Sequence, residues 1–444
     1  MSDLENLNSV TVWLTTADQS SLLQRQTNEH YFSEYNSDLP VISVDVEQKY
    51  QAIEGFGFSL TGGSAMLISR LPFTDRHLLL RELFLPDGIG ISFLRLTIGS
   101  SDLSERCFTY HDSSDPDLDD FNIQAGDIEV IPLLREILAV NPKIKLMATA
   151  WSAPTWMKTN ESFIGGKLRP DCYALYATYL VKYLQAMRDH GITIHALTPQ
   201  NEPLNLKNEP SMIMEAEEQA EFIKHHLGPA LLSFGFGDVE LFCWDHNCDV
   251  KEYPLAVFAD IEARRYLSGS AWHLYGGDIA TLSEVHQLYP DMKLYFTEQW
   301  VGSDGQFGGD LMWHVKNVLI GSIRNWSRVV LEWNLASDPF CCPHTPGGEA
   351  RCVGALTIGD EVVRNVAYYI IAHAAKFVRP GSVRIDSDIS SLNNVAFLTP
   401  ESNIVLIALN DSDDSRSFCI RFQEKQIVAT LPAGSVATYV WKRD

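Results

Sequence analysis

The sequence is short of positive charge. Only 34 of its 444 residues are lysine or arginine, against 57 aspartates and glutamates, which gives a formal net charge of −23. An electric field of that sign repels the phosphate backbone of nucleic acids and the surface of anionic membranes. We therefore expect no nucleic-acid partner for this protein.

Long hydrophobic runs are absent as well. No stretch approaches the run of about 18 uncharged apolar residues that a membrane-spanning helix requires. Residues 1–30 also lack the basic start and the apolar run of a Sec-type signal. We expect no integral membrane segment and no export by the Sec route.

Cysteine is scarce, with eight scattered residues in the whole chain. Small secreted domains that rely on disulfides contain far more cysteine, so we expect free thiols in a reducing compartment. Cys243, His246 and Cys248 are residue types that bind zinc, but a fourth ligand is missing and their spacing matches no closed zinc site. We expect neither a metal ion nor another cofactor.

What the chain does have is a repeated alternation of β-like and helical segments. Hydrophobic residues make up 45% of the sequence, enough for a large core. Between residues 55 and 375, eight short β-like runs are separated by longer segments of helical periodicity, such as 172–188. The runs cover residues 55–60, 91–98, 144–151, 194–200, 239–244, 270–275, 293–297 and 328–335. This order predicts an α/β fold, a closed (β/α)8 TIM barrel.

The pattern changes near residue 379. From there on, apolar and polar residues alternate with a period of two, which predicts an antiparallel all-β unit. Residues 41–45 alternate in the same way ahead of the barrel, and the Pro-Gly turn signal within 378–382 marks a boundary. We therefore divide the chain into an N-terminal segment, 1–54, a barrel domain, 55–378, and a C-terminal β domain, 379–444.

Two glutamates stand at the carboxyl ends of predicted barrel strands, where TIM-barrel enzymes carry their catalytic groups. Glu202 follows the fourth run and Glu298 follows the seventh, so their side chains can face each other across one cleft. Glycoside cleavage uses such a pair, because one carboxyl must protonate the leaving oxygen while the other stabilises or attacks the sugar carbon. Either residue taken alone is as well explained as a solvated or ion-paired loop residue. The pair together favours catalysis.

Aromatic residues gather at the same strand ends. Their flat rings can stack on the apolar C–H faces of a sugar, while neighbouring polar side chains such as Asp245, His246 and His273 bind its hydroxyl groups. The alternative is that these rings belong to the barrel core. The aromatic residues are Trp151, Trp156, Trp244, Tyr275, Trp300 and Trp333. Together they predict a carbohydrate-binding cleft.

Several motifs resemble those of glycoside hydrolase family 30. They are GFGFSLTGG at 55–63, RLTIGSSDLS at 95–104, AWSAPTWMK at 150–158, TPQNEP at 198–203, HLY at 273–275, FTEQWVGS at 296–303, EWNLA at 332–336 and AAKFVRPGS at 374–382. The resemblance covers about residues 50–444. It implies a TIM barrel joined to an antiparallel β-sandwich, to which the segment 1–54 contributes one or two strands.

The resemblance also implies a retaining double displacement. In it, Glu298 is the nucleophile, Glu202 is the acid/base, and Asn201 binds the sugar 2-hydroxyl group. We expect the two carboxyl groups to lie about 5 to 5.5 Å apart. The charge of Glu298 and a partly dry cleft should raise the pKa of Glu202 towards about 6. The other residues expected to bind the substrate are Asp102, Trp151 and Trp333 around the non-reducing sugar, His273 and Tyr275 beside the nucleophile, and Asp245 and Trp300 in the same cleft.

The resemblance leaves the substrate open, because relatives divide between glucosylceramide, β-1,6-linked glucan and xylosides. Trp300 and the loop 339–352 depart from lysosomal glucosylceramidase. Our first hypothesis is a hydrolase of glucosylceramide-like β-glucosides, with a β-1,6-glucanase or a β-xylosidase as the alternative. An inactive carbohydrate-binding protein is the non-enzyme alternative. The expected partner is thus a β-glucoside, either a glycolipid or a glucan.

The chain also resembles a glucosylceramidase-like effector that enteric bacteria export by type III secretion. We therefore expect a protein that is cytoplasmic or is exported by such a non-Sec route. Its start, rich in Ser, Thr, Asn and Gln, would suit that export. The sequence leaves the oligomeric state open.

Overall fold

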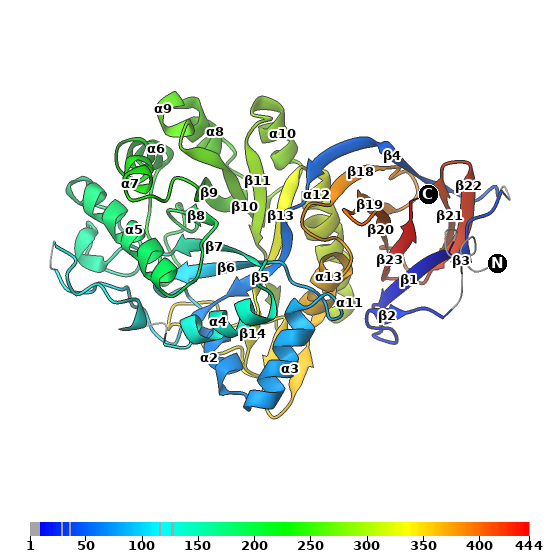
Figure 1. The fold of residues 1–444 in the computed structure, drawn as a ribbon, viewed down its shortest axis with the longest axis horizontal. Helices are drawn as coiled ribbons and strands as arrows, with labels where there is room; N and C mark the ends of the chain where they lie inside the picture. The colour runs from blue at the N-terminus through cyan, green and yellow to red at the C-terminus, as the bar shows by residue number, and fades with distance from the viewer. Residues whose placement is uncertain (1–8, 28–29, 35–36, 115–116, 126–127, 444) are drawn as a thin grey trace.

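The computed structural model describes residues 9–443, except 28–29, 35–36, 115–116 and 126–127. Figure 1 shows two parts side by side, a barrel surrounded by helices and a β domain that contains the first and the last of the described strands. The first eight residues of the segment 1–54 lie outside the described residues.

Eight parallel strands close into a barrel (Figure 1). Each strand pairs with the next one along the chain, and the last, β13, pairs with the first, β5. The strands are β5 (Gly55–Leu60), β6 (Phe93–Ile98), β7 (Lys145–Ala150), β8 (Ala196–Thr198), β9 (Glu240–Cys248), β10 (Leu267–Gly277), β11 (Lys293–Glu298) and β13 (Ser327–Asn334). Each of the eight runs expected from the sequence overlaps one of these strands. The predicted α/β barrel is therefore confirmed.

Side chains fill the inside of the barrel. Phe242 and Tyr295 stack there with their ring centroids 4.1 Å apart, and both belong to a buried cluster drawn from strands all round the barrel. The cluster comprises Phe93, Met147, Ala196, Phe242, Ala271, Tyr295, Val329 and Leu331. Because these side chains fill the interior, the barrel is a packed core. Residues that take part in chemistry are therefore expected at the carboxyl ends of the strands.

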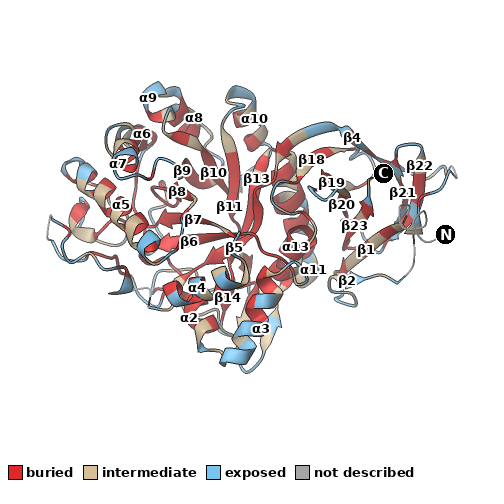
Figure 2. Cartoon of the chain, in the orientation of Figure 1, coloured by how far each residue is buried: buried red, intermediate tan, exposed pale blue. Residues whose placement is uncertain are grey.

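Helices cover the outside of the barrel, and Figure 2 shows that their buried sides face the strands while their exposed sides face solvent. In α5 (Tyr173–Asp189), which matches the helix expected at 172–188, Tyr176, Leu180 and Leu184 recur at helical spacing and are buried. The other helices are α2 (Gly62–Arg70), α3 (Phe73–Phe84), α4 (Val130–Val140), α6 (Ala216–Phe222), α7 (Gly228–Ser233), α8 (Glu252–Ala259), α9 (Ile261–Arg264), α10 (Thr281–Leu288), α11 (Phe307–His314), α12 (Gly321–Arg324) and α13 (Val366–Ala375), with π-helical turns η4 (Ile223–Leu227) and η5 (Val315–Ile320) and 3₁₀ turns η1 (Ile123–Ala125), η2 (Thr155–Met157) and η3 (Pro170–Cys172).

The β domain is a ten-stranded sheet that folds over its own hydrophobic core to form a β-sandwich. Val12, Ile42, Leu406, Ile420 and Trp441 are among the buried residues of this core. Strands from before the barrel and strands from after it therefore share one interior. The strands are β1 (Ser9–Thr16), β2 (Gln24–Arg25), β3 (His30–Tyr31), β4 (Val41–Ala52), β18 (Val383–Ser387), β19 (Asn393–Leu398), β20 (Asn403–Asn410), β21 (Arg416–Phe422), β22 (Lys425–Leu431) and β23 (Ser435–Lys442).

The predicted β-sandwich is confirmed, and one of its strand pairs is parallel. β21 runs parallel to β4, with Ile420 opposite Ile42. Antiparallel neighbours are usually joined by a short hairpin, whereas parallel neighbours need a long connection. Here the whole barrel domain lies between β4 and β21 in the sequence, so the connection is long enough for parallel pairing.

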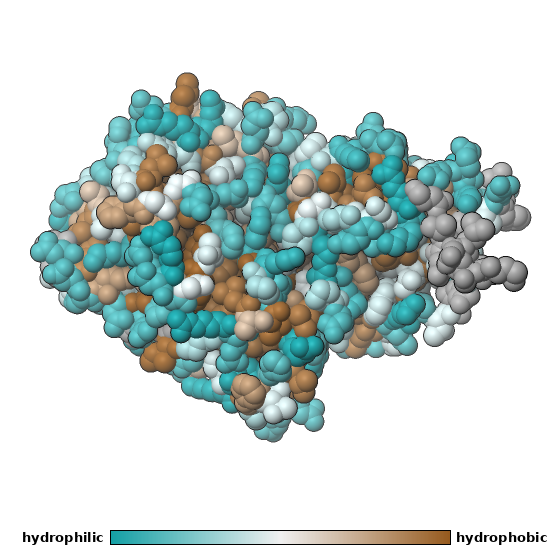
Figure 3. Space-filling model, in the orientation of Figure 1, coloured by the Kyte–Doolittle hydropathy of each residue, from teal (hydrophilic) through white to brown (hydrophobic). Residues whose placement is uncertain are grey.

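The face of the molecule seen in Figure 3 is a mosaic of hydrophilic side chains with hydrophobic patches between them. Several exposed apolar side chains stand on separate helices, such as Phe73 on α3, Ile261 on α9 and Leu288 on α10. Single exposed apolar residues of this kind are normal for a protein surface. Among the described residues, no helix combines the length and the apolar character needed to cross a membrane.

Candidate active site

A cavity of about 260 Å³ opens at the carboxyl ends of the barrel strands. Both glutamates that the sequence singles out line it, together with four of the expected substrate-binding residues. The other four, Trp151, Asn201, Asp245 and His273, are buried behind the lining. The lining residues are Asp102, Glu202, Asn205, Asn208, His246, Asn247, Tyr275, Glu298, Trp300, Trp333 and Glu349.

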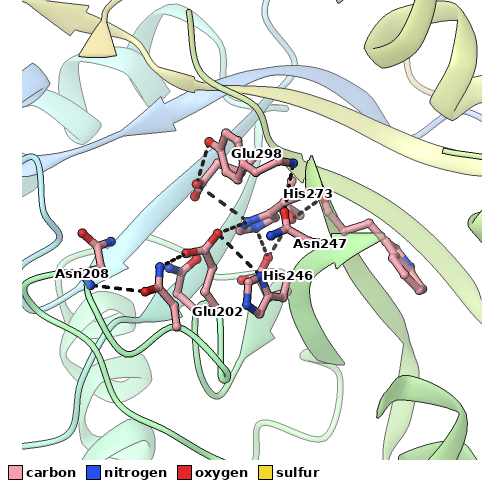
Figure 4. A network of polar contacts seen from close by, with 12 residues as sticks. Glu202, Asn208, His246, Asn247, His273 and Glu298 are labelled. Carbon is pink, nitrogen blue, oxygen red and sulfur yellow. Dashed lines mark hydrogen bonds and ion pairs between the residues drawn. The ribbon is translucent and has the colours of Figure 1, made fainter. Parts of the chain in front are cut away.

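Glu202 stands on the loop that follows β8. Its backbone has a φ of 42°, in the left-handed region that non-glycine residues seldom adopt, and its N–H donates to the carbonyl oxygen of Asp245 at 2.9 Å. Its side chain is held at both oxygens (Figure 4): Nδ1 of His273 lies 3.1 Å from Oε1, and Nδ2 of Asn205 donates to Oε2 at 2.7 Å. The carboxylate therefore has a fixed position at the cavity wall.

Glu298 ends strand β11 on the other side of the cavity. Nη1 of Arg95 donates to its Oε2 at 2.6 Å, and the hydroxyl of Tyr275 donates to its Oε1 at 3.0 Å. Nδ1 of His273 lies 3.8 Å from Oε1 of Glu298 and 3.1 Å from Oε1 of Glu202, so these two oxygens are less than about 7 Å apart. Both carboxylates can therefore reach one glycosidic bond.

Arg95, on strand β6, connects the polar groups beneath the cavity. Its side chain is fully buried, and Nη2 donates to Asn201 at 2.6 Å and to Asp245 at 2.9 Å. The guanidinium also lies against the rings of Trp151 and Trp333, 4.8 and 5.5 Å from their centroids. Asn201 and Trp151 thus support the site from behind, because both act on the arginine that holds the Glu298 carboxylate.

Asp245 owes its position to a bulge in strand β9. Trp244 and Asp245 both have left-handed backbone angles, with φ of 74° and 63°, and the pairing with β10 skips a residue at this point. A bulge of this kind redirects side chains and is common beside active sites. It brings the wholly buried Asp245 carboxylate to Arg95 and His273, and it brings His246 to the cavity wall.

Three threonines complete the shell around Asp245. Thr198 and Thr297 donate to its carboxylate at 2.7 and 2.6 Å, and Thr149 does so at 3.2 Å. Burial opposes ionisation of this carboxyl, but the Arg95 charge and the hydrogen bond from His273 hold the pKa of Asp245 well below its usual range. Asp245 is therefore a buried anion that organises the site, and it does not touch the cavity.

The charges around His273 reverse the pKa expectation for Glu202. Burial favours the neutral forms of both groups, but Glu298 and the hydrogen bonds to Asp245 and Glu202 raise the pKa of His273 to about 9. The His273 hydrogen bond and the charges of His246 and His273 lower the pKa of Glu202 to about 2, rather than raising it towards 6. Burial raises the pKa of Glu298, with His273 and Arg95 opposing. In the free protein the proton therefore sits on His273.

Asp102, Trp300 and Trp333 also line the cavity. Burial and the charges of Glu298 and Glu202 raise the pKa of Asp102 to about 8, and among the described residues its Oδ1 has no hydrogen-bond partner. A buried polar oxygen of this kind is well placed to meet a sugar hydroxyl. The ring of Trp333 stacks on Trp151 at 5.2 Å, so only Trp333 of that pair faces the cavity.

Not every aromatic residue at the strand ends is part of the cavity. Tyr275, Trp300 and Trp333 line it. Trp244 is completely buried and packs against Tyr253 at 4.5 Å, so for this residue the barrel-core alternative is correct. Trp151 is likewise buried, and the part-buried Trp156 donates to the carbonyl oxygen of His111.

The loop 339–352 reaches the cavity through Glu349. It is held by the short pairing of β12 (Val301–Gly302) with β15 (Cys352–Val353), next to a small sheet of β14 (Ala336–Ser337), β16 (Leu356–Ile358) and β17 (Val362–Arg364). Arg351 binds Glu349 at 2.9 Å and lies 5.3 Å from the centroid of Trp300. The loop therefore carries part of the cavity wall.

Sequence reasoning missed five residues of the site. Arg95 could have been found, because an arginine inside the apolar run FLRLTI must have buried partners. Asn205 and Asn208 follow Glu202 on the same loop, but nothing in their spacing marks them. Asn247 and Glu349 come to the cavity only through the bulge in β9 and the fold of the loop 339–352.

The chemistry available is that of two fixed carboxylates beside a small polar cavity, one next to a proton-bearing histidine and one next to an arginine. Glu202, His246 and His273 are also the described residues that could share one metal ion, because one ligand atom from each lies within 4.8 Å of the others. The pairing of two such carboxylates matches the requirements of glycoside cleavage.

Comparison with known proteins agrees with this geometry. The chain is similar to the endo-1,6-beta-D-glucanase neg1 of Aspergillus fumigatus, with 31% identity over 88% of this chain and 85% of that protein. It is also similar to the lysosomal acid glucosylceramidase of Mus musculus, with 29% identity over 91% of this chain and 84% of that protein.

Two solved structures superpose on nearly the whole molecule. The endo-beta1,6-glucanase BT3312 matches with a TM-score of 0.92 and 35% identity, over 98% of this chain and 100% of that one. SrfJ from Salmonella typhimurium matches with a TM-score of 0.93 and 29% identity over the same shares. Residues 53–378 match the glycosyl hydrolase family 30 TIM-barrel domain, and residues 381–439 match the glycosyl hydrolase family 30 beta sandwich domain. The chain therefore belongs to glycosyl hydrolase family 30, whose members hydrolyse glycosidic bonds.

Proposed function

We propose that this protein is a retaining β-glucosidic hydrolase that acts on β-1,6-linked glucan. Glu298 is its nucleophile and Glu202 its general acid and base. Their nearest oxygens lie less than about 7 Å apart, which fits the gap of about 5 to 5.5 Å that retaining enzymes use and excludes most of the range of about 6.5 to 9.5 Å that inverting enzymes use.

In the first half-reaction, an oxygen of Glu298 attacks the anomeric carbon of the bound glucose unit. The bond from that carbon to the glycosidic oxygen breaks, and the oxygen takes a proton from Glu202. That proton starts on Nδ1 of His273, 3.1 Å from Oε1 of Glu202, and passes to the carboxylate as the leaving oxygen approaches. The products are a glucosyl ester of Glu298 and the free hydroxyl of the leaving group.

In the second half-reaction, Glu202 takes a proton from a water molecule, whose oxygen attacks the anomeric carbon from the side that the leaving group has vacated. The ester bond to Glu298 breaks, and glucose leaves with its original β configuration. Arg95 and Tyr275 bind the released carboxylate at 2.6 and 3.0 Å, so its returning charge is stabilised at once.

The observation that carries the choice of substrate is the polar wall around Glu202. The leaving group must lie beside the acid, and there it meets Asn205, Asn208, His246 and Asn247. Amide and imidazole groups of this kind bind the hydroxyls of a sugar, whereas the alkyl chains of a ceramide would leave them without hydrogen bonds at a cost of about 1 to 3 kcal/mol each. The wall thus favours a second sugar as the leaving group, as in a glucan.

The similarity to two endo-1,6-β-glucanases supports the same choice. Glucosylceramide is the second candidate, supported by the lysosomal relative and by two exposed apolar residues near the cavity. Leu206 is 62% exposed on the loop after Glu202, and Ile164, 43% exposed, precedes Gly165, which faces Leu206. An alkyl chain could lie across these side chains.

A direct test measures kcat/KM on a soluble β-1,6-glucan, on glucosylceramide in detergent micelles, and on aryl β-glucoside and aryl β-xyloside. We expect the glucan to exceed glucosylceramide by at least about tenfold, which corresponds to one hydrogen-bonded contact. Glu298→Gln is the control, since it removes the nucleophile and should abolish every activity. Turnover of glucosylceramide alone, or of the xyloside alone, would overturn the proposed substrate.

The roles of the two glutamates are separated by rescue with azide. Glu202→Ala should still form the glucosyl ester from a nitrophenyl β-glucoside, because that leaving group needs no proton, and azide should then release β-glucosyl azide. Glu298→Ala should yield no β-glucosyl azide. NMR of the azide product decides, and the opposite pattern would exchange the two roles.

A further inference from the structure

His246 belongs to the polar wall around Glu202. Its imidazole ring lies next to the Glu202 carboxylate but forms no hydrogen bond to it. The residue is 9% exposed, and its Nδ1 lies 3.7 Å from Oε1 of Glu202. Among the described residues this nitrogen has no hydrogen-bond partner. Figure 4 shows the imidazole next to Glu202 and His273. A buried polar atom left unpaired beside two other ligand-type groups indicates a missing ligand.

The spacing of the three groups suits a small tetrahedral ion. Nδ1 of His273 and Nδ1 of His246 lie 3.1 and 3.7 Å from Oε1 of Glu202, and one ligand atom from each of the three residues lies within 4.8 Å of the others. Zinc binds histidine nitrogen and carboxylate oxygen at about 2.0 to 2.2 Å, so neighbouring ligands around it are about 3.3 Å apart. Small side-chain rotations would therefore bring all three atoms to bonding distance.

The surroundings of His273 fit a metal ligand as well. Its Nε2 lies 3.1 Å from Oδ1 of Asp245, whose carboxylate is wholly buried. Metal-binding histidines usually donate their second ring nitrogen to a carboxylate, which fixes the tautomer and the orientation of the ring. With Nε2–H bonded to Asp245, Nδ1 is the nitrogen left for an ion.

We propose that Glu202, His246 and His273 form an inhibitory zinc site in the catalytic cavity. Two histidines and one glutamate are a known ligand set for zinc, and the fourth position opens to the cavity, where water completes the tetrahedron. Binding sends the proton shared by Nδ1 of His273 and Oε1 of Glu202 to solvent. The ion then occupies the oxygen that must carry the proton to the leaving group, so catalysis stops.

The cysteines near His246 in the sequence play no part in this site. Cys243 and Cys248 are both buried, and Sγ of Cys248 lies 3.2 Å from the carbonyl oxygen of His273. The two groups that accompany His246 are 44 positions before it and 27 positions after it in the sequence, at Glu202 and His273. The proposed ligands therefore differ from the set considered from the sequence, which was Cys243, His246 and Cys248. They come from separate parts of the sequence and meet only in the folded barrel.

Calorimetric titration of the metal-free protein with ZnCl₂ tests the site directly. We expect one zinc per chain, inhibition of aryl β-glucoside hydrolysis at the half-reaction in which Glu202 takes a proton from water, and full recovery with EDTA. His246→Phe keeps the packing against Trp244, whose ring lies 4.9 Å away, but removes both nitrogens. It should raise both the dissociation constant and the inhibitory concentration of zinc by at least about tenfold. His246→Asn should do the same, and thermal unfolding shows that each variant is folded.

His225→Phe is the matched control. His225 is half exposed on the π-helical turn η4, with Glu221 3.6 Å away, and so represents adventitious zinc binding at the surface. Zinc inhibition should be the same in this variant as in the wild type. Inhibition that persists in His246→Phe, or that disappears when Cys107, Cys341 and Cys342 are changed to serine, would overturn the proposal. Because the titration needs no substrate, it decides the site even if the glucan assay fails.

Discussion

Arg95 sets the charge balance of the site. Its fully buried guanidinium faces the carboxylates of Asp245 and Glu298 at 2.9 and 2.6 Å. Without it, the three carboxylates of Asp245, Glu298 and Glu202 would share one small volume. Removing one partner of a buried ion pair leaves an uncompensated charge, at a cost of about 3 to 5 kcal/mol. An arginine within an apolar barrel strand is therefore explained by the carboxylates that it neutralises.

His273 should control the alkaline limit of activity. In the free enzyme the transferable proton sits on His273, whose pKa is raised to about 9, so kcat/KM should fall as the pH rises through that value. In His273→Gln, Glu202 has lost its cationic neighbour and must hold the proton itself. Its pKa then rises through burial and the charge of Glu298, yet stays below that of the lost imidazolium. The alkaline limb should shift to lower pH by about two units.

The measurement is the pH profile of kcat/KM on β-1,6-linked oligosaccharides, with EDTA present in every sample. An aryl glucoside serves as the comparison, since its leaving group needs no proton and its alkaline limb should move less. If the limb stays in place for the oligosaccharide, another group controls it. Asp102 is the alternative, because its pKa is raised to about 8.

For single residues, the sequence predicts a place in the site only where that place follows from the position of the residue next to a predicted strand. Glu202 and Glu298 were found because each follows a β-like run, and strand ends of a barrel meet at one mouth. The role of Asp245 could not be predicted, since a bulge turns it away from the cavity and towards Arg95. The pKa of Glu202 was expected in the wrong direction, because the sequence does not show that His273 lies 3.1 Å from it.

Among the elements, the loop 339–352 has the clearest functional consequence. Arg351 donates to Glu349 from Nε and Nη2, at 2.9 and 3.2 Å, and covers the ring of Trp300. Both partners line the cavity. The arginine side chain is itself 55% exposed, so solvent screens its charge and each of these contacts is weak. The loop therefore shapes the binding site without taking part in the bond changes.

Arg351→Met should raise KM for the glucan by about two- to fivefold and leave kcat within about a factor of two, because ordering of Trp300 and Glu349 is lost while both remain in place. Steady-state kinetics on the glucan provide the check. Arg443→Met, which breaks a surface contact with Glu47 on the sandwich, is the matched control and should change neither constant. A fall in kcat at unchanged KM would instead place Arg351 in the transition state.

The periodicity of the sequence predicted the strands and helices, whose pattern is local. It did not predict the pairings between segments that lie far apart in the chain. All eight barrel strands and the long helix α5 show their period in the sequence, because each buries one face or both in a regular way. The parallel pairing of β21 with β4 has no local signal, since its two members are separated by the whole barrel. The same holds for β12 and β15, whose two-residue pairing positions the loop 339–352.

The whole molecule is held together by a polar contact as well as by apolar packing. His373, on helix α13 beside the barrel, is fully buried between Thr438 on β23 and Thr15 on β1. Its Nδ1 lies 2.9 Å from Oγ1 of Thr438, a hydroxyl that itself donates to the carbonyl oxygen of His373. Nδ1 must therefore carry the hydrogen, and Nε2 accepts from Thr15. The contact requires a neutral ring.

This neutral ring should make the joined domains sensitive to acid. Burial lowers the pKa of His373 to about 3, whereas in the unfolded chain it is about 6.5. Between these values the unfolded state binds one more proton than the native state, so the free energy of unfolding should fall by about 1.4 kcal/mol for each pH unit below 6.5. The contribution of the neutral His373 ring to the free energy of unfolding is fully present above pH 6.5 and is lost as the pH falls.

Denaturant unfolding at several pH values tests this against His373→Gln, which keeps a polar side chain but cannot take up the proton. The variant should be less stable at pH 7, because it loses the two threonine contacts, and its stability should fall less steeply between about pH 5.5 and 4. The carboxylates titrate in both proteins, so the difference in slope isolates one group. Thr438→Val is the control: it removes a contact, costs about 1 kcal/mol at every pH, and should keep the wild-type slope. Equal slopes in the wild type and His373→Gln would show that His373 does not cause the acid sensitivity.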